Sequence, residues 1–380
     1  MNEVLITGYG LVSSLGNSAD ELYQNLFSNR CGIEVIPEWK DLRGLHSHLG
    51  ARARKVDVSF LPRTTRRTMT PMSEMAYVAT VDALKMAGIS PRLEGIPRNR
   101  IAFILGSTGG SSETMLHYFG KYVKNGGPEG QNATSFFKCM NHTVLANVMG
   151  ALEVQAPALS VSSACATSTQ AAILGAELIQ AGVYDIVIAG GADELHDTAA
   201  AIFDTVLAAC RDNRDPHQSI RPFDAARSGL AVSEGAGVLV LESMKSLERR
   251  GVQAKARVLG GAYTMDGDHM AQPRAEAMRT CMEMALVRAK VEPKSVQYLN
   301  AHATSTVLGD AEESRAISAL FGNQVPVSSL KGHLGHSLAA CGAIELISCL
   351  KMFEHQTLLP TRNLENVAAD LMVDVKLAKK

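Results

Sequence analysis

Several features that would assign the chain to a broad class at once are missing from the sequence. The net charge is −1 at pH 7 over 380 residues, so the chain as a whole does not attract polyanions and any electrostatic docking must be local. No apolar run approaches the roughly 18 residues of a membrane span. The first residues, MNEVLITGYG, have neither the basic start nor the apolar core of a signal peptide. We therefore expect a soluble, cytoplasmic protein.

Paired cysteines and a dinucleotide fingerprint are missing too. The seven cysteines are odd in number and form no CxxC pair, which argues against a disulfide framework or a zinc site and for a reducing compartment. The stretch ITGYGLVSSLG has Ser13 where GxGxxG needs its third glycine, so a dinucleotide site is disfavoured. We expect Gly8 and Gly10 to serve only a tight turn after the first strand.

What is present is an alternation of apolar strands and helices. Apolar runs at 3–10, 101–107, 158–163, 184–191, 235–242, 296–302 and 325–329 are typical of buried strands. Helical spacing lies between several of them, at 71–88, 169–182 and 275–290. Buried strands separated by helices predict an α/β protein with a largely parallel sheet. The pattern restarts after a weak seam at 243–255, so the chain forms one large domain or two.

One cysteine stands apart from the other six by its position. Cys165 lies in VSSACATSTQ, between a predicted strand and a predicted helix, among side chains no larger than threonine. The N-terminus of a helix has unpaired N–H groups and partial positive charge, which makes a thiol there easier to ionise. Small neighbours also let a substrate carbonyl approach the sulfur. Because a free cysteine is often only a buried hydrophobe, this stretch alone leaves nucleophile and packing equally open.

Histidines follow two further predicted strands. His302 ends the strand at 296–302, and Lys331, His333 and His336 follow the strand at 325–329. Open α/β folds build their active sites at the carboxyl ends of strands, where Cys165 also lies. The three strand ends are therefore expected to converge on one crevice.

Three motifs together resemble the active-site motifs of the β-ketoacyl-acyl carrier protein synthases. They are SSACATSTQ, NAHATST followed by Gly309 and Asp310, and SSLKGHLGHS followed by Glu345. More narrowly, they resemble the elongating, two-histidine type of fatty-acid and polyketide systems. The likeness also covers ITGYGLVSSLG, SIRPFDAARSGLAVSEGAGVLVLE and LLPTRNLEN, so it runs in order over nearly the whole chain.

This resemblance implies a thiolase fold, in which two similar α/β halves pack as five layers, α-β-α-β-α, and the chain pairs as a homodimer or with a related subunit. The half at 1–250 would carry the nucleophile and the half at 251–380 both histidines. By motif match, Cys165 takes the acyl group from an acyl carrier protein, while His302 and His336 face the malonyl thioester carbonyl. Lys331 is counted with these three as catalytic, Glu345 and Asp310 support them, and Thr304 and Thr306 bind the pantetheine arm. No metal or further cofactor is implied, because the phosphopantetheine arm arrives on the carrier.

The chemistry explains these residue types. A thiolate is intrinsically reactive, and exchange between two thioesters is nearly isoenergetic. Loss of CO₂ from malonate develops an enolate on the thioester oxygen, and two neutral imidazoles can donate N–H bonds to it. One such donor is typically worth ~3–4 kcal/mol. Lys331 would hold both histidines neutral, since a nearby cation lowers a histidine pKa. His333 has no defensible role, so a structural one is expected.

A cationic cluster marks a candidate docking surface. Arg63, Arg66 and Arg67 lie together in LPRTTRRTM in a nearly neutral chain. Such a cluster is usually only a solvated face. Acyl carrier proteins are acidic, however, and the spacing resembles the carrier-docking helix of the family.

The sequence departs from the family at its end. It stops at VDVKLAKK, whereas relatives continue through a strand pair with a Gly-Phe-Gly-Gly-Thr-Asn loop that gives the second oxyanion donor, beside the backbone N–H of the cysteine. Losing one such donor could cost roughly 10²–10³ in rate. We expect either a truncated form or a partner that covers the gap. Ala303, where glycine is usual, is a smaller and tolerable departure.

Two other functions stay open. A non-catalytic partner, like the chain-length factors of polyketide synthases, typically lacks the cysteine, so Cys165 with both histidines argues against it. A thiolase needs a second cysteine as base in a Gly-rich loop; Cys341 precedes a glycine but lies in an apolar helix, where packing explains it better. The length of the acyl chain stays open, with Thr108, Met115 and Phe136 as candidates for its pocket.

Overall fold

A six-stranded sheet forms the centre of the computed structural model, which describes residues 2–267 and 272–372. Its strand order is β5 (Ala158–Ser160), β4 (Ile101–Gly106), β6 (Ile186–Asp193), β8 (Gly235–Ser243), β1 (Val4–Val12) and β9 (Ala256–Val258). β5, β4 and β6 are parallel, whereas β8 is antiparallel to β6 and to β1, and β9 is antiparallel to β1. The prediction of a largely parallel sheet was therefore wrong. A strand buried on both faces is apolar throughout in either direction, so its pattern does not reveal its direction.

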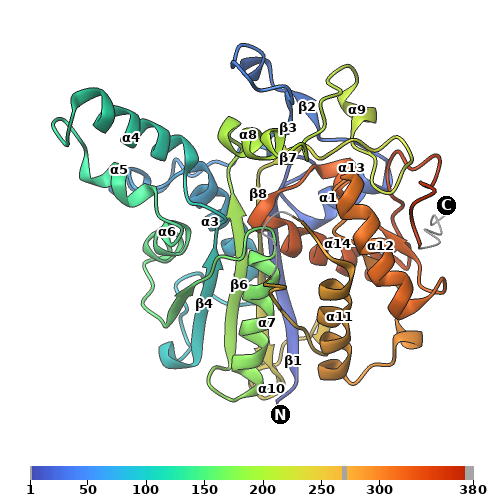
Figure 1. Ribbon diagram of the computed structural model, residues 1–380. Helices are drawn as coiled ribbons and strands as arrows, with labels where there is room; N and C mark the ends of the chain where they lie inside the picture. The colour runs from blue at the N-terminus through green and yellow to red at the C-terminus, as the bar shows by residue number, and fades with distance from the viewer. Residues whose placement is uncertain (1, 268–271, 373–380) are drawn as a thin grey trace.

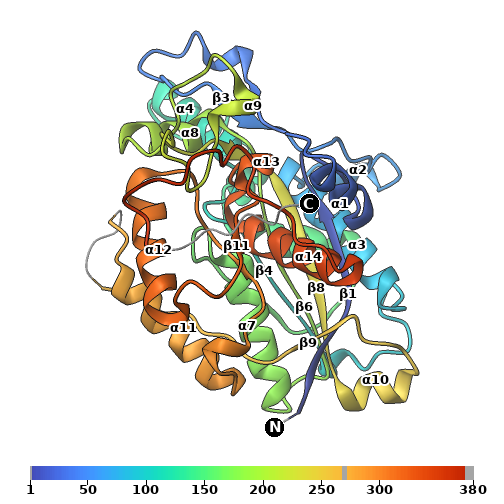
Figure 2. The same cartoon turned by 90° about the vertical axis from the view of Figure 1, so that its right-hand side faces the viewer.

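Helices cover both faces of this sheet and separate it from a second, smaller one. α3 (Pro71–Met86) and α6 (Thr143–Leu152) share a core with one face, and α1 (Ala19–Phe27), α7 (Thr167–Gln180) and α14 (Cys341–His355) with the other. Beyond them, β10 (Leu299–Asn300) and β11 (Val327–Ser328) pair in parallel and pack on α12 (Val307–Phe321), beside α11 (Ala275–Ala289). Figure 1 shows the six-stranded sheet between α3 and α6 on one side and α7, α11 and α12 on the other, and Figure 2, turned by 90°, labels β11 of the second sheet.

The remaining elements surround these layers. β2 (Glu34–Val35), β3 (Leu49–Ala51) and β7 (Val232–Ser233) form a three-stranded sheet. The other α-helices are α2 (Arg63–Arg66), α4 (Ser112–Asn125), α5 (Ala133–Lys138), α8 (Asp197–Thr205), α9 (Pro216–Ser219), α10 (Met244–Arg250) and α13 (Lys331–Leu334). Four 3₁₀ turns complete the described part: η1 (Pro37–Trp39), η2 (Arg98–Arg100), η3 (Pro293–Ser295) and η4 (Leu338–Ala340). Within it, no helix is both long and apolar enough to cross a membrane.

The elements expected from the sequence are present, although β5, β10 and β11 are shorter than predicted and β1 and β8 are longer. Each of the seven predicted strand segments contains a strand, and the three predicted helices correspond to α3, α7 and α11. The strands of the second sheet are the shortest of these, with two residues each in β10 and β11. All seven cysteines are free thiols.

Gly8 and Gly10 have a different role from the tight turn that we expected. Both lie inside β1, where the sheet meets α3 at backbone contact. A Cβ on Gly8 would lie 2.2 Å from the Ala83 carbonyl oxygen, and one on Gly10 would lie 2.1 Å from that of Ala79. The glycines are thus needed for the approach of helix and strand, not for a turn.

Gly10→Ala should destabilise the fold, because the added methyl group must push a helix backbone away from the sheet. Overpacking of this kind costs about 1–3 kcal/mol, measured as a lower free energy of unfolding in urea. Gly120→Ala in α4 is the matched control, since a Cβ there meets nothing within 4 Å. Equal losses, or none, in the two variants would contradict this account of Gly10.

Candidate active site

The three residues expected at strand ends do converge. The side chains of Cys165, His302 and His336 bring one ligand-type atom each to within 4.8 Å of one another. Nε2 of His336 lies 2.9 Å from the Cys165 sulfur. The two imidazole rings stand almost perpendicular, at 83°, with their centroids 5.0 Å apart. One small volume therefore contains a thiol and two imidazoles.

A strained turn presents the cysteine. β5 ends at Ser160 and α7 begins at Thr167, and between them Ala164 has φ +47°, which favours glycine. The Thr167 hydroxyl stabilises this turn, since it accepts the N–H of Ser163 at 2.9 Å and donates to the Ala164 carbonyl at 2.7 Å. Among the described residues, no backbone carbonyl accepts the N–H of Cys165. That donor is free for an oxygen that develops charge beside the sulfur.

The acidity of Cys165 differs from our expectation. Burial of the thiol raises its pKa to about 11, and the nearby Lys331 cation only partly opposes this. Desolvation therefore opposes the ionisation that we expected from the helix N-terminus. The thiol is protonated at neutral pH, and its deprotonation has to be coupled to the arrival of the substrate.

Both histidines are neutral at physiological pH. The surrounding protein lowers the pKa of His336 well below 6.5, and His302 and Lys331 lower it further. Desolvation also lowers the pKa of His302, and the Lys331 cation lowers it further. Part of the His302 side chain is nevertheless exposed to solvent. Nδ1 of His336 is buried without a partner among the described residues. A buried orphan N–H is costly, so the proton belongs on Nε2, which faces Cys165.

Lys331 is buried and paired. Its ammonium lies 2.5 Å from the Glu345 carboxylate, with 2% of the lysine side chain and 12% of the glutamate side chain exposed. The attraction of Glu345 offsets the cost of burial, so the pKa of Lys331 is raised and the lysine stays charged. The ammonium of Lys331 thus stays charged near both histidines and lowers the pKa of each.

Sequence reasoning missed Glu313. Its two carboxylate oxygens accept the N–H groups of His302, at 2.8 Å, and of Ala303, at 2.7 Å. They therefore fix the backbone that carries the His302 ring. The only sequence signal is spacing: Glu313 follows Asp310 by three residues, which places both on one face of α12.

Asp193 was missed as well. It is buried at the end of β6, where it accepts the Thr108 hydroxyl at 2.6 Å and the Ala339 N–H at 2.8 Å. It joins the loop after β4 to the loop before α14. Burial raises its pKa to about 7. A buried strand that ends in an acidic residue was the available signal.

Asp310 supports the loop at Thr304–Thr306, called the threonine loop below. The Thr304 and Thr306 hydroxyls lie 3.1 Å apart, and Ser305 between them has φ +72°. Asp310 accepts the N–H of Ser305 at 3.1 Å and that of Phe223 at 2.8 Å. Asp310 thus supports the loop through its backbone.

His333 is turned away from this site. It is fully buried, and its Nδ1 lies 2.9 Å from the Arg30 carbonyl oxygen. Burial lowers its pKa to about 4. These contacts agree with the structural role expected from the sequence.

The other candidates lie farther out. Arg63, Arg66 and Arg67 are exposed on the single turn of α2 and its end. Thr108 is next to the cysteine turn, since its carbonyl accepts the Ser162 hydroxyl at 3.2 Å. Met115 and Phe136 lie on α4 and α5, which project from the molecule in Figure 1. Within the described chain, no hydrogen bond or ring contact links them to the cysteine turn. VDVKLAKK, at 373–380, lies outside the described residues.

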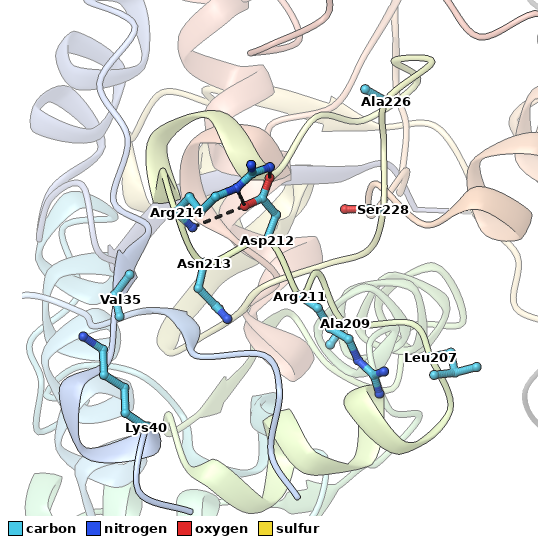
Figure 3. A pocket seen from close by; sticks show the side chains of 10 residues that line it. All are labelled: Val35, Lys40, Leu207, Ala209, Arg211, Asp212, Asn213, Arg214, Ala226 and Ser228. Atoms are coloured by element: carbon cyan, nitrogen blue, oxygen red, sulfur yellow. Dashed lines mark hydrogen bonds and ion pairs between the residues drawn. The ribbon is translucent and has the colours of Figure 1, made fainter.

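A separate depression of about 940 Å³ opens beside the threonine loop. It is shown in Figure 3 and is lined by Val35, Lys40, Leu207, Ala209, Arg211, Asp212, Asn213, Arg214, Ala226 and Ser228. Two of its arginines already have carboxylate partners: Arg214 pairs with Asp212 at 2.8 Å, and Arg211 with the buried Asp204 at 2.7 Å. None of the predicted site residues lines it, so the chemistry lies elsewhere.

Cys165, His302 and His336 are close enough to hold one metal ion. The buried ammonium of Lys331 acts on both histidines, however, and would repel a divalent cation placed between them. The same charge suits an anionic intermediate at that point.

Family models and solved structures identify the family and the fold of the chain. The β-ketoacyl synthase N-terminal domain model matches residues 1–246, and the C-terminal domain model matches residues 255–365. A β-ketoacyl synthase from Burkholderia phymatum STM815 superposes with a TM-score of 0.95 at 36% identity, over 100% of this chain and 93% of that one. The ishigamide ketosynthase/chain length factor superposes with a TM-score of 0.90 at 28% identity, over 98% and 91% of the two chains. The architecture is therefore the thiolase fold, as the resemblance implied.

Curated relatives extend over the same length. 3-oxoacyl-[acyl-carrier-protein] synthase 1 of Escherichia coli K12 is 35% identical over 373 residues, which cover 97% of this chain and 90% of the relative. The protein of the same name from Haemophilus influenzae is 32% identical, over 97% and 89% of the two chains. With both family models matched in order and the cysteine and two histidines of the motifs together in one site, the chain belongs to the β-ketoacyl synthase family.

Proposed function

We propose that this chain is a condensing enzyme, which carries an acyl group on Cys165 and extends it with the two-carbon unit of a malonyl thioester. The observation that carries the proposal is the grouping of the Cys165 thiol with two neutral imidazoles, one of them 2.9 Å from the sulfur. The relatives are named 3-oxoacyl-[acyl-carrier-protein] synthases, which supports an acyl carrier protein as the donor of both thioesters.

In the first step the acyl group moves from one thiol to another. The Cys165 sulfur attacks the carbonyl carbon of the acyl thioester, and its proton is transferred to the departing carrier thiol. The carbonyl oxygen becomes an oxyanion in between, and we expect the N–H of Cys165, which no backbone carbonyl of the described residues accepts, to donate to it. Because the pKa of the thiol is about 11, proton loss and attack are expected together.

In the second step the malonyl thioester loses its carboxylate as CO₂. The electron pair of the broken C–C bond forms an enolate, whose oxygen accepts the Nε2–H of His336 and an N–H of His302. The enolate carbon attacks the acyl carbonyl on Cys165, and the C–S bond breaks. The β-ketoacyl chain leaves on the carrier, and the cysteine sulfur takes up a proton. Both donors are in place before charge develops, so they favour the transition state over the ground state.

The threonine loop is assigned to the pantetheine arm. Thr304 and Thr306 present two hydroxyls 3.1 Å apart on a loop that Asp310 fixes. Hydroxyls can donate to or accept from the amides of the arm. We assign the chain to elongation in a fatty-acid or a polyketide pathway. The length of its acyl substrate stays open.

The chain is expected to pair with a second subunit through β5. This strand is at the edge of the main sheet, with Leu159 46% exposed, and such an edge is a template for pairing. Apolar side chains on α4 and α5 are exposed as well: Leu116, Phe119, Tyr122, Val123, Phe136 and Phe137. A homodimer and a heterodimer with a chain-length-factor-like subunit both fit, and Cys165 with both histidines makes this chain the catalytic member.

Cys165→Ala should abolish covalent acyl transfer, because no other thiol adjoins both histidines. Incubation with an acyl-loaded carrier protein should add the acyl mass to the wild-type chain and not to the variant, as measured by intact-protein mass spectrometry. Cys281→Ala, in α11, is the control and should be acylated. A folded wild-type chain that acquires no acyl mass would overturn the proposed function for the chain alone.

Lys331→Met should make decarboxylation more sensitive to acid. An imidazole is neutral above its pKa, and Lys331 lowers the pKa of both histidines, so its loss raises them and moves histidine protonation to higher pH. An imidazolium would stabilise the malonyl carboxylate that has to leave. As the pH is lowered, the rate of CO₂ release by the wild type should stay constant to pH 6.5. The rate of the variant should already fall above pH 6.5.

Lys351→Met is the matched control, because Lys351 is also a buried lysine in an ion pair but contacts Asp20 and Glu354. Its profile should follow the wild type. Coincident profiles for the wild type and Lys331→Met would contradict the role given to Lys331.

Reversing Arg66 and Arg67 to Glu should raise KM for the carrier-bound substrate and leave kcat nearly unchanged, since the change weakens docking of an acidic carrier. Lys245→Glu with Lys294→Glu changes the net charge equally on two other exposed elements, α10 and η3, and should leave KM unaltered. Steady-state kinetics at low ionic strength measure both. An unchanged KM in the arginine variant would exclude this docking surface.

A further inference from the structure

A second thiol lies directly against the nucleophile turn. Cys341, the first residue of α14, is 3% exposed, and its sulfur lies 3.2 Å from the Cys165 carbonyl oxygen. Within the described chain, no other donor reaches this carbonyl. The neighbouring backbone N–H groups bind other carbonyls: that of Thr167 donates to the Ala164 carbonyl, and that of Gln170 to the Ala166 carbonyl. The S–H of Cys341 therefore satisfies an otherwise unpaired carbonyl.

The register of this contact is fixed by the packing of α14 on α7. A Cβ on Gly342 would lie 2.0 Å from the Thr169 hydroxyl, so glycine is required where the two helix starts meet. One residue on, the N–H of Ala343 donates to the Ser168 hydroxyl at 3.0 Å. With these two neighbours held, Cys341 has little freedom to face anything but the Cys165 carbonyl.

The contact holds one side of the peptide that follows Cys165. On the other side of the same peptide, the N–H of Ala166 donates to the Ser163 carbonyl at 2.9 Å. A peptide plane bonded at both its C=O and its N–H cannot rotate, which fixes ψ of Cys165. The Cα–Cβ bond then keeps the direction that places the sulfur 2.9 Å from Nε2 of His336.

We propose that Cys341 is a positioning residue for the nucleophile, which donates its S–H to the Cys165 carbonyl and so holds the Cys165 sulfur toward His336. The inference rests on the proposed function for acyl transfer, while the reactivity of Cys165 toward a simple alkylating agent tests it separately. Burial raises the pKa of the Cys341 thiol well above 9, so it keeps the proton that it donates. This gives the second cysteine a role other than a thiolase-type base, since its proton faces a backbone carbonyl.

Three variants separate the hydrogen bond from packing. Cys341→Ala removes the donor, Cys341→Ser keeps a donor of similar size, and Cys349→Ala, eight residues along the same helix, is the matched control. The rate at which iodoacetamide alkylates Cys165, located by peptide mass, should fall roughly five-fold in Cys341→Ala, the equivalent of one hydrogen bond. Cys341→Ser and Cys349→Ala should react like the wild type.

Acyl transfer should follow the same order. The single-turnover rate of acylation from an acyl-loaded carrier should fall in Cys341→Ala and recover in Cys341→Ser, while the carrier concentration that gives half the maximal rate stays unchanged. A merely structural role would change the midpoint of unfolding without this selective loss. If Cys341→Ala does not fold, Cys341→Val replaces it, since valine keeps the volume without the donor.

The outcomes distinguish a failure of the positioning role from a failure of the proposed function. Wild-type rates in the donor-less variant, or equal losses in Cys341→Ser and Cys341→Ala, would overturn the inference. A wild-type chain that is alkylated at Cys165 but never acylated would instead count against the proposed function, and the alkylation rates would still test the positioning role.

Discussion

Partial removal of the active site from water, with His336 buried, Cys165 half-buried and His302 exposed on one side, is the constraint on which the rest of this structure depends. Desolvation raises the pKa of the Cys165 thiol and lowers the pKa of His302 and His336, so the resting site holds three neutral groups. The cation beside them is Lys331, and its ion pair with Glu345 keeps it charged despite its burial. A site of this kind stabilises little until negative charge forms on a substrate oxygen, and then its donors act in a medium of low dielectric.

The fold supplies the positions that this chemistry needs. Cys165 comes from the turn between β5 and α7, His302 from the end of β10 and His336 from the loop before α14, so elements of both sheets meet at one point. Glu313 fixes the backbone of His302, and Asp193 joins the loops of Thr108 and Ala339. These carboxylates accept backbone N–H groups, and Asp193 accepts the Thr108 hydroxyl as well, which restrains the loops without adding a reactive side chain to the site.

Much of this was predictable from the sequence, and the failures have physical causes. Fully apolar strands and helical spacing gave the elements, and the three motifs gave the residues that meet. Strand direction was not predictable, since a strand buried on both faces is apolar either way. Gly8 and Gly10 were misassigned because contact between a helix backbone and a strand leaves no local pattern. The desolvation that raises the pKa of Cys165 could not be predicted, because burial is a property of the whole fold and leaves no local pattern in the sequence. Glu313, Asp193 and Cys341 were missed as site residues because each acts on a backbone group brought near only by tertiary packing.

The central claim, that the folded site keeps both imidazoles neutral with an N–H directed at the thiol, is tested most directly by NMR titration of the chain labelled with ¹⁵N in its histidine rings. His302→Ala and His336→Ala spectra assign the two signals. Both rings should remain neutral from alkaline pH down to 6.5 and below, with the proton of His336 on Nε2. Protonation of either ring above pH 6.5, or a proton on Nδ1 of His336, would contradict the account.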